Sequence, residues 1–420
     1  MMRIIMSKNR RMPQLRFKEF SGEWENKCFG DIYSFLQTNS FSRALLNYEN
    51  GDIKNIHYGD IHTKFKSNFY IQDETVPYIN QNIDLSKIKE ENYCKEKDLV
   101  IADASEDYKD IGKAIELIDL NNEKLLTGLH TYIARDYKNK MALGFSGYFM
   151  QTYKVRVQMM KMATGISVLG ISKGNLNKLE LTIPQKQEQE KIASFLSSID
   201  KKINQLSKKD ELLQNYKKAM MQKIFSQKLR FKKENRSDYP KWEEKSLNEL
   251  VEFNNGKAHE NNIDESGKYI VVNSKFISSN GTVKKYSNSQ IFPLHKNDIV
   301  MVMSDVPNGK ALSKCYLIDK DNKYTLNQRI CSLRQTVNNN RFLIYLINRN
   351  KYYLAFDSGV GQTNLRRDEV LNLKLKVPSI EEQTKIANFL FSLDTKISQN
   401  KKALEVTKKF KKALLQKMFV

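Results

Sequence analysis

Basic side chains recur in short segments that also hold small or amide-bearing residues, such as "HTKFKSNF" from His62 and "TNLRRDE" from Thr363. Glycine, asparagine and serine favour turns, so we expect these segments to form loops. Lys and Arg bind phosphates, and Arg, Asn, Gln and Ser also form hydrogen bonds with base edges. The candidate nucleic-acid contacts are Lys64, Lys66, Lys109, Lys113, Lys173, Lys310, Lys314, Gln328, Arg329, Arg366 and Arg367.

Motifs that would supply catalysis are missing from the sequence. It contains no Pro-Pro, which the base-binding motif of an adenine methyltransferase would need. The segment "SGVGQTN" from Ser358 does not fit a dinucleotide-binding pattern, and "PNGKALSK" from Pro307 lacks the first glycine and the Ser/Thr of a phosphate loop. The five histidines and four cysteines form no metal-binding spacing. We therefore expect a protein that reads a ligand, with no catalytic residues, metal or cofactor of its own.

The charge of the chain also favours a polyanionic partner. Its 420 residues include 70 Lys and Arg against 48 Asp and Glu, a net charge of +22. Nucleic acid is the first partner to consider and an anionic membrane the second, although lysine can also be the default surface residue of a proteome. No apolar run approaches the roughly 20 residues of a membrane span. The scattered cysteines fit a reducing, cytoplasmic location.

One long segment occurs twice. "IPQKQEQEKIASFLSSID" from Ile183 matches "VPSIEEQTKIANFLFSLD" from Val377 at a shift of 194 residues, the difference between Pro378 and Pro184. The match continues to "YKKAMMQKIF" and "FKKALLQKMF" near the end of each copy. This register over some forty residues indicates an internal duplication.

Each copy is predicted to form one long helix. A proline opens it, acidic residues follow, and no glycine or proline interrupts it. Apolar residues recur at steps of three and four, the spacing of a coiled-coil seam, and the other copy is the nearest partner for that seam. The predicted seam residues are Leu196, Ile199, Ile203, Leu206, Leu213, Met220, Ile224, Leu390, Leu393, Ile397, Leu404, Leu414 and Met418.

The region before each helix is predicted to be a mixed α/β globule. Short alternating runs such as "KYIVVNSKFI" and "KCYLIDK" are separated by Gly and Asn turns, and an alternating strand precedes each proline. The two globules resemble each other at their ends and differ in their middles. The predicted fold is therefore α+β, with a globule at 1–183, a helix at 184–228, a variant globule at 229–377 and a second helix at 378–420. Two different basic globules joined by rigid spacers would suit a bipartite, asymmetric DNA site.

The order of these parts resembles the specificity subunits of type I restriction–modification systems, over nearly the whole chain. The segments that carry the resemblance are the two long repeats and their trailing "YKKAMMQKIF" and "FKKALLQKMF". It implies two target recognition domains, two spacer helices that pair antiparallel, and a double-stranded DNA target of two half-sites separated by a fixed gap. It also implies two modification (methyltransferase) subunits and restriction (translocase/nuclease) subunits as partners, which would carry S-adenosylmethionine and ATP/Mg. No membrane partner is implied.

Other interpretations stay open at this point. A free-standing regulator with two DNA-binding modules would have the same parts, but it would bind its site tightly without partner subunits. A fused nuclease–methyltransferase would be longer and would carry the missing motifs, and a purely structural scaffold would not need two diverged globules. The lysines along the predicted helices, such as Lys201 and Lys217, form either a solvated outer face or a surface toward DNA.

Overall fold

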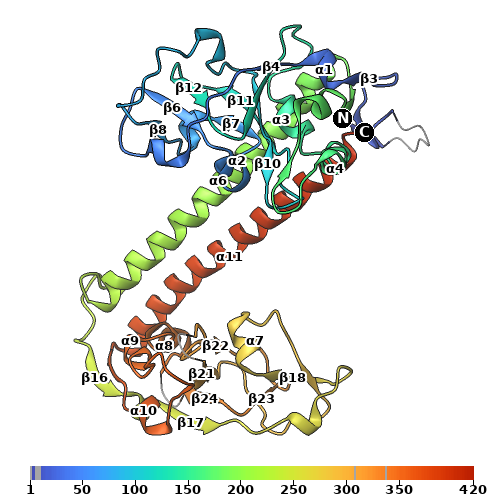
Figure 1. The fold of residues 1–420 in the computed structure, drawn as a ribbon. Coiled ribbons are helices and arrows are strands. Elements are labelled where there is room, and N and C mark those ends of the chain that lie inside the picture. The colour runs from blue at the N-terminus through green and yellow to red at the C-terminus, as the bar shows by residue number, and fades with distance from the viewer. Residues whose placement is uncertain (1, 5–10, 307–308, 336–337) are drawn as a thin grey trace. The chain divides into compact units, whose positions relative to one another are not determined.

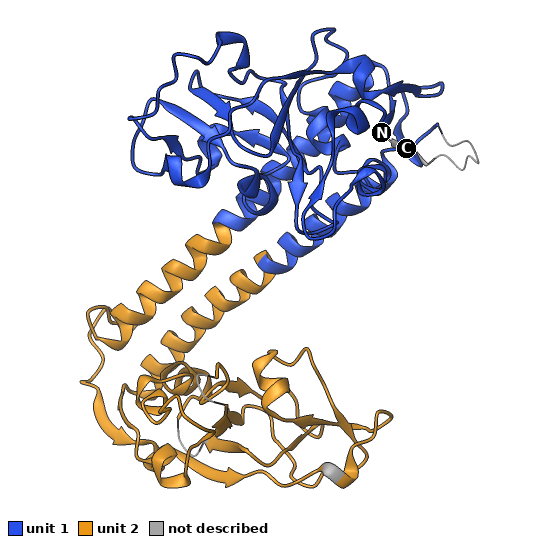
Figure 2. Ribbon diagram, in the orientation of Figure 1, with its two compact units in different colours: residues 1–208, 401–420 blue, residues 209–400 orange. Residues whose placement is uncertain are grey.

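The computed structural model describes residues 2–4, 11–306, 309–335 and 338–420. The chain forms two compact units (Figures 1 and 2): unit 1 comprises Met1–Lys208 with Lys401–Val420, and unit 2 comprises Lys209–Asn400. Helices α6 (Lys186–Phe225) and α11 (Ile380–Lys417) are each shared between the two units. The compact units therefore divide the chain inside the two long helices, whereas the four predicted segments divide it at their ends.

Unit 1 is a mixed α/β globule with two sheets. The five-stranded sheet has the order β4 (Ser34–Leu36), β13 (Thr131–Arg135), β9 (Leu99–Ala102), β11 (Ala114–Asp119), β7 (Asn68–Tyr70). The four-stranded sheet has the order β12 (Lys124–Thr127), β6 (Ile53–Ile56), β8 (Tyr78–Ile79), β5 (Leu46–Asn47). Three two-stranded ribbons pair β1 (Met2–Ile4) with β2 (Leu15–Phe17), β3 (Glu25–Cys28) with β15 (Glu180–Ile183), and β10 (Ala104–Ser105) with β14 (Leu169–Gly170). The short helices are α1 (Phe29–Ile32), α2 (Tyr58–Thr63), α3 (Phe145–Phe149), α4 (Tyr153–Met162) and α5 (Lys173–Asn177).

Unit 2 repeats this plan with fewer strands. One sheet has the order β17 (Val251–Asn255), β24 (Ile330–Gln335), β20 (Ile299–Val302), β22 (Cys315–Leu317), and the other β19 (Tyr286–Ser287), β18 (Tyr269–Val272), β23 (Tyr324–Leu326). The ribbons pair β16 (Glu243–Ser246) with β26 (Lys374–Val377) and β21 (Ser304–Asp305) with β25 (Thr363–Asn364). The short helices are α7 (Ser274–Ser278), α8 (Asn340–Ile347), α9 (Lys351–Leu354) and α10 (Arg367–Leu371). Both units thus have the mixed α/β character that the sequence predicted.

The two long helices pair antiparallel within each unit. In unit 1 the core joins Leu196 and Ile199, near the start of α6, with Leu414 and Met418, near the end of α11. In unit 2 the core joins Ile224, near the end of α6, to Leu390 near the start of α11. Every predicted seam residue is at least half-buried: Leu196, Ile199, Leu206, Ile224, Leu390, Leu393, Leu414 and Met418 are buried, and Ile203, Leu213, Met220, Ile397 and Leu404 are intermediate.

The prolines lie just outside the helices instead of in their first turns. At the start of α6 the carbonyl of Gln185 accepts hydrogen bonds from the backbone N–H groups of Glu188, at 3.0 Å, and Gln189, at 3.1 Å. Gln185 is therefore the N-cap residue, and Pro184 precedes it. The Gln189 side chain then donates to the Pro184 carbonyl at 2.9 Å. Gln383 donates to the Pro378 carbonyl at the same distance in α11. The prediction that a proline opens each helix is therefore wrong by two residues. The proline lies before the N-cap, and its carbonyl accepts a hydrogen bond from a glutamine side chain of the first turn.

The same ion pair fixes each globule to the start of a long helix. In unit 1 Arg16 forms two hydrogen bonds of 2.7 Å with Glu188. In unit 2 Arg230 forms the equivalent bonds with Glu382, at 3.2 and 2.6 Å. The sequence "LRF" occurs at 15–17 and 229–231, and "EQ" occurs at 188–189 and 382–383, so each "LRF" meets an "EQ" that is more than 150 residues away along the chain. A bidentate Arg–carboxylate pair sets geometry as well as charge, so it defines how the segment before each globule meets the start of the long helix.

A tyrosine–aspartate–lysine contact joins each globule to both long helices. In unit 1 the Tyr148 hydroxyl donates to Asp200 of α6 at 2.7 Å, and Lys411 of α11 donates to the same carboxylate at 2.6 and 2.7 Å. Burial and the neighbouring carboxylate raise the pKa of Tyr148, so the hydroxyl keeps its proton and acts as a donor. The equivalent contacts in unit 2 join Tyr345, Asp394 and Lys217.

Candidate nucleic-acid interface

The candidate contacts of unit 1 lie on loops and at the ends of short helices. Lys64 follows α2 and pairs with the buried carboxylate of Asp60 at 2.9 Å, and Lys66 lies 4.0 Å from Asp73. Lys173 opens α5, with its ammonium group over the ring of Tyr132 at 5.2 Å. The exposed members are Lys64, Lys66, Lys109 and Lys173, whereas Lys113 is half-buried. Whether they contact DNA stays a prediction.

The candidates of unit 2 gather near the ends of strands. Gln328 and Arg329 form part of the connection from β23 to β24, and Arg366 caps α10, where it pairs with Glu369 at 2.9 Å. The guanidinium of Arg367 lies 5.6 Å from the ring centre of Phe253. The exposed members are Lys310, Gln328, Arg329, Arg366 and Arg367, whereas Lys314 is half-buried. Their contact with DNA also stays a prediction.

Lys113 and Lys314 have the same structural environment in the two units. The Lys113 ammonium group donates to the carbonyl of His62 at 2.5 Å, at the end of α2, and Lys314 donates to the carbonyl of Ser278 at 2.8 Å, at the end of α7. A lysine at a helix C-terminus satisfies terminal carbonyls and interacts favourably with the helix dipole. These two lysines therefore have a structural task that accounts for their presence in both units.

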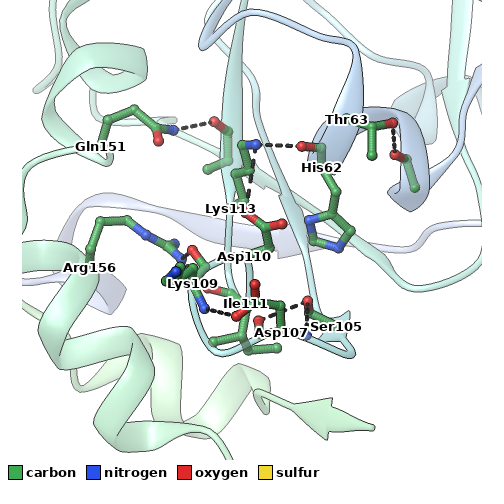
Figure 3. A network of polar contacts seen from close by, with 12 residues as sticks. His62, Thr63, Ser105, Asp107, Lys109, Asp110, Ile111, Lys113, Gln151 and Arg156 are labelled. Atoms are coloured by element: carbon green, nitrogen blue, oxygen red, sulfur yellow. Dashed lines mark hydrogen bonds and ion pairs between the residues drawn. The ribbon is translucent and has the colours of Figure 1, made fainter. Parts of the chain in front are cut away.

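An arginine supports the loop that carries each of these lysines. Figure 3 shows Arg156 of α4 reaching the loop between β10 and β11, where it donates to the carbonyls of Lys109 at 2.8 Å and Ile111 at 2.6 Å. In unit 2, Arg349 donates to the carbonyl of Leu312 at 3.1 Å. Each loop is thus held by charge-assisted hydrogen bonds to its backbone, which leaves its remaining side chains free to differ.

Unit 1 has a buried acid at a position of β11 where the equivalent strand of unit 2, β22, has an apolar residue. Glu116 of β11 is 1 % exposed and accepts from the backbone N–H groups of Gly144 and Gly147, both at 2.7 Å. Burial raises its pKa to about 7, although these backbone hydrogen bonds act in the opposite direction. Since Ala114 pairs with Ile101 and Cys315 with Met301, the equivalent residue of β22 is Leu317.

Sequence reasoning missed several polar residues beside the candidates. His130 precedes β13, and its Nδ1 lies 3.2 Å from Asp103. In unit 2, the Gln362 amide donates to Ser304 and, at 3.3 Å, to Asn364. The sequence signal for the latter group is the segment "SGVGQTN", whose glycines resemble a cofactor loop but whose amide side chains also suit hydrogen bonds with a ligand. Among the described residues no group of His, Cys, Asp and Glu could hold a metal ion, and no helix is long and apolar enough to cross a membrane.

Comparison with known proteins identifies the family. The sequence matches the family described as "Type I restriction modification DNA specificity domain" twice, over residues 21–214 and 239–408. It is 26 % identical over 309 residues to the type I restriction enzyme MjaVIII specificity subunit of Methanocaldococcus jannaschii, covering 68 % of this chain and 71 % of that one. It is also 23 % identical over 363 residues to a putative type I restriction enzyme MjaX specificity subunit from that organism, covering 80 % and 83 %.

A solved structure shares the fold. The crystal structure of a type I restriction-modification system S subunit from M. genitalium superposes with a TM-score of 0.63 at 18 % identity, covering 97 % of this chain and 99 % of that one. The two family matches together span most of the chain. The chain therefore belongs to the type I restriction modification DNA specificity family, as a specificity subunit with two recognition domains.

Proposed function

We propose that this specificity subunit reads a bipartite, asymmetric DNA target, with one half-site for each recognition domain. The observation that carries the proposal is the contrast between a repeated framework and divergent surfaces. The Arg–Glu pair and the Tyr–Asp–Lys contact occur in both units. The loop side chains differ in part, because Tyr108 and Asp110 on one loop stand where Gly309 and Ala311 stand on the other. Two readers with different surfaces recognise two different half-sites.

In this proposal the two long helices set the gap between the half-sites. An uninterrupted helix has a fixed rise of 1.5 Å per residue, so it sets a separation that a flexible linker would not. The high positive charge supplies the phosphate contacts that hold the protein in register. In this proposal the protein recognises bases only in the two half-sites. The gap between them can have any sequence, but its length is fixed.

We further propose that the chain itself is non-catalytic and directs two modification (methyltransferase) subunits and the restriction subunits to its target. Its sequence lacks the base-binding motif of an adenine methyltransferase. S-adenosylmethionine and ATP with Mg would then be bound by the partner subunits. A second copy of the framework in one chain offers two equivalent sets of helix surfaces, which suits two copies of the same partner.

Methylation mapping tests this proposal directly. The chain is co-expressed with the modification subunits of its own system, and methylated adenines are located genome-wide by single-molecule sequencing. We expect one motif with two unlike half-sites and a fixed gap. Exchange of residues 14–183 for the corresponding domain of another specificity subunit should change one half-site and leave the other. A palindromic or continuous motif would contradict two different readers.

A further inference from the structure

The two recognition domains share an unusual backbone conformation at the end of one equivalent connection. His130 ends the connection from β12 to β13, and Arg329 ends the connection from β23 to β24. The carbonyl of His130 accepts from the N–H of Asp103 at 3.1 Å, and the carbonyl of Arg329 accepts from the N–H of Met303 at 3.0 Å. The strands that follow pair in the same register, Thr131 with Ala102 and Ile330 with Val302. The two residues are therefore structural equivalents.

Both residues have a backbone conformation that side chains disfavour. The φ angle is +58° at His130 and +74° at Arg329, although neither is glycine. Such conformations persist where the surrounding structure imposes them, and they cluster at functional sites. The flanking strands and the carbonyl hydrogen bond impose the conformation in both units. The position thus offers a fixed starting point for a side chain.

The side chain at this position differs between the units while its backbone does not. Phosphates are the same in every DNA sequence, so a residue that contacts only phosphate has no reason to differ between two readers. Lys113 and Lys314, which cap equivalent helices, are the same residue in both units. A base-reading residue must differ when the half-sites differ. His130 in unit 1 and Arg329 in unit 2 differ in this way, as expected for residues that read different bases.

The surroundings of Arg329 suit base recognition. Its side chain is exposed and has no hydrogen bond or ion pair with any residue that the structure describes. Exposed Gln328 precedes it, and Lys257 contacts the same connection, accepting from the Gln328 N–H at 2.9 Å through its carbonyl. The neighbouring ribbon presents Gln362 and Asn364. Arginine forms a bidentate pair with O6 and N7 of guanine in the major groove, and amide side chains read adenine.

His130 has a different hydrogen-bonding character. Its side chain is 46 % exposed, and Nδ1 lies 3.2 Å from the Asp103 carboxylate. In the neutral ring the Nδ1–H donates to this carboxylate, which leaves Nε2 as an acceptor. An acceptor suits the exocyclic amino group of cytosine or adenine and does not suit the guanine edge.

We propose that this position is a base-reading position in both recognition domains: Arg329 contacts guanine in one half-site, and His130 contacts a base with an amino donor in the other. The inference rests on the proposed function, since it needs a bipartite DNA target. It adds which residue sets one base of each half-site.

The test compares Arg329→Asn, Arg329→Gly and His130→Asn with the unchanged chain, each co-expressed with the modification subunits, by mapping methylated motifs. Asparagine and glycine tolerate positive φ, so the backbone is kept. The control is Arg236→Asn: Arg236 is also an exposed arginine of unit 2 with a φ of +64°. We expect both Arg329 variants to lose a required guanine in one half-site, His130→Asn to relax one base of the other, and Arg236→Asn to keep the motif.

A competition assay with purified complexes gives the size of the effect. Duplexes that carry each of the four bases at the affected position compete for binding, and the preference for guanine should fall about 5- to 150-fold in both Arg329 variants. Unchanged base preference in these variants would overturn the inference and leave the proposed function intact, even if methylation itself is lost. So would changes of the Arg329 and His130 variants in the same half-site. An unchanged chain that methylates no bipartite motif would overturn the proposed function, and the inference with it.

Discussion

Units 1 and 2 use equivalent Arg–Glu pairs to fix the globule to a long helix, but the two pairs differ in their exposure to solvent. The side chains of Arg16 and Glu188 in unit 1 are 2 % and 1 % exposed, whereas in unit 2 Arg230 is 24 % exposed and Glu382 is fully buried. The Trp242 indole adds a 3.1 Å hydrogen bond to Glu382. The duplicated framework thus has the same contacts in both units, whereas the exposure of these side chains to solvent differs. The two units should therefore respond unequally when equivalent contacts are removed.

The largest difference is expected for Glu188→Gln against Glu382→Gln. Removing one partner of a buried pair leaves an uncompensated charge and costs about 3–5 kcal/mol, so unit 1 should lose about that much stability. Arg230 can reach water, so Glu382→Gln should cost roughly 1–2 kcal/mol. The chain has two tryptophans, Trp24 in unit 1 and Trp242 in unit 2. Denaturant unfolding followed by fluorescence in Trp242→Phe and Trp24→Phe backgrounds reports each unit. Equal losses would show that burial does not distinguish the two pairs.

A pH-dependent difference should follow from Glu116. Its pKa is raised from 4.5 to about 7 in the folded state, so between these values the unfolded state ionises while the folded state keeps its proton. The stability of unit 1 should therefore fall as pH rises through this window, by about 3 kcal/mol from this group, and Glu116→Gln should remove that slope. Trp24 fluorescence at a series of pH values measures it. Unit 2 has Leu317 at the equivalent position and serves as the control. Identical slopes with and without Glu116 would contradict the assignment.

Asp200→Asn and Asp394→Asn should have nearly equal effects. Each change removes a charged partner from a lysine and weakens a tyrosine hydrogen bond, in a half-exposed setting, so each unit should lose about 1–2 kcal/mol. The same fluorescence backgrounds measure both. A loss in only one unit would mean that the two Tyr–Asp–Lys contacts are not equivalent in energy.

The smallest effects should come from Lys113→Met and Lys314→Met. Each change removes an interaction with a helix C-terminus and should cost about 0.5–1 kcal/mol. DNA binding by the complex should keep its salt dependence, because a lost phosphate contact would lower the slope by about one. Lys310→Met, on the exposed part of the same loop as Lys314, is the matched variant, which we expect to lower that slope. A lower slope for Lys113→Met or Lys314→Met would place these lysines on phosphates after all.

Much of the framework could be predicted because its signals are local. Heptad spacing places residues such as Leu196 and Leu390 on one face of a helix, and alternating residues before each proline form the strands that end at Ile183 and Val377. These patterns depend on neighbours within a few residues, so the sequence displays them directly.

The interface could be predicted only in part because its determinants are distant in sequence. A lysine in a turn looks the same whether it meets DNA or caps a helix, and the partner carbonyl of Lys113 lies 51 residues away. Positive φ occurs at both His130 and Arg329, although only histidine is enriched in this conformation, so strand pairing and not residue type imposes it at this position. The search for Lys and Arg in probable loops identified Arg329 as a candidate, and it passed over His130 because histidine is neither.

The division of the chain between the units has a consequence for synthesis. Unit 2 is continuous in sequence, so all of its residues are available once residue 400 has been made. Unit 1 is not, because its core includes Leu414, Met418 and Phe419, and the Phe419 ring lies 6.4 Å from that of Trp24. Domains generally fold as units during synthesis. Here the part of the chain that emerges first must leave apolar surface uncovered while the whole of unit 2 is translated, and it completes its core last.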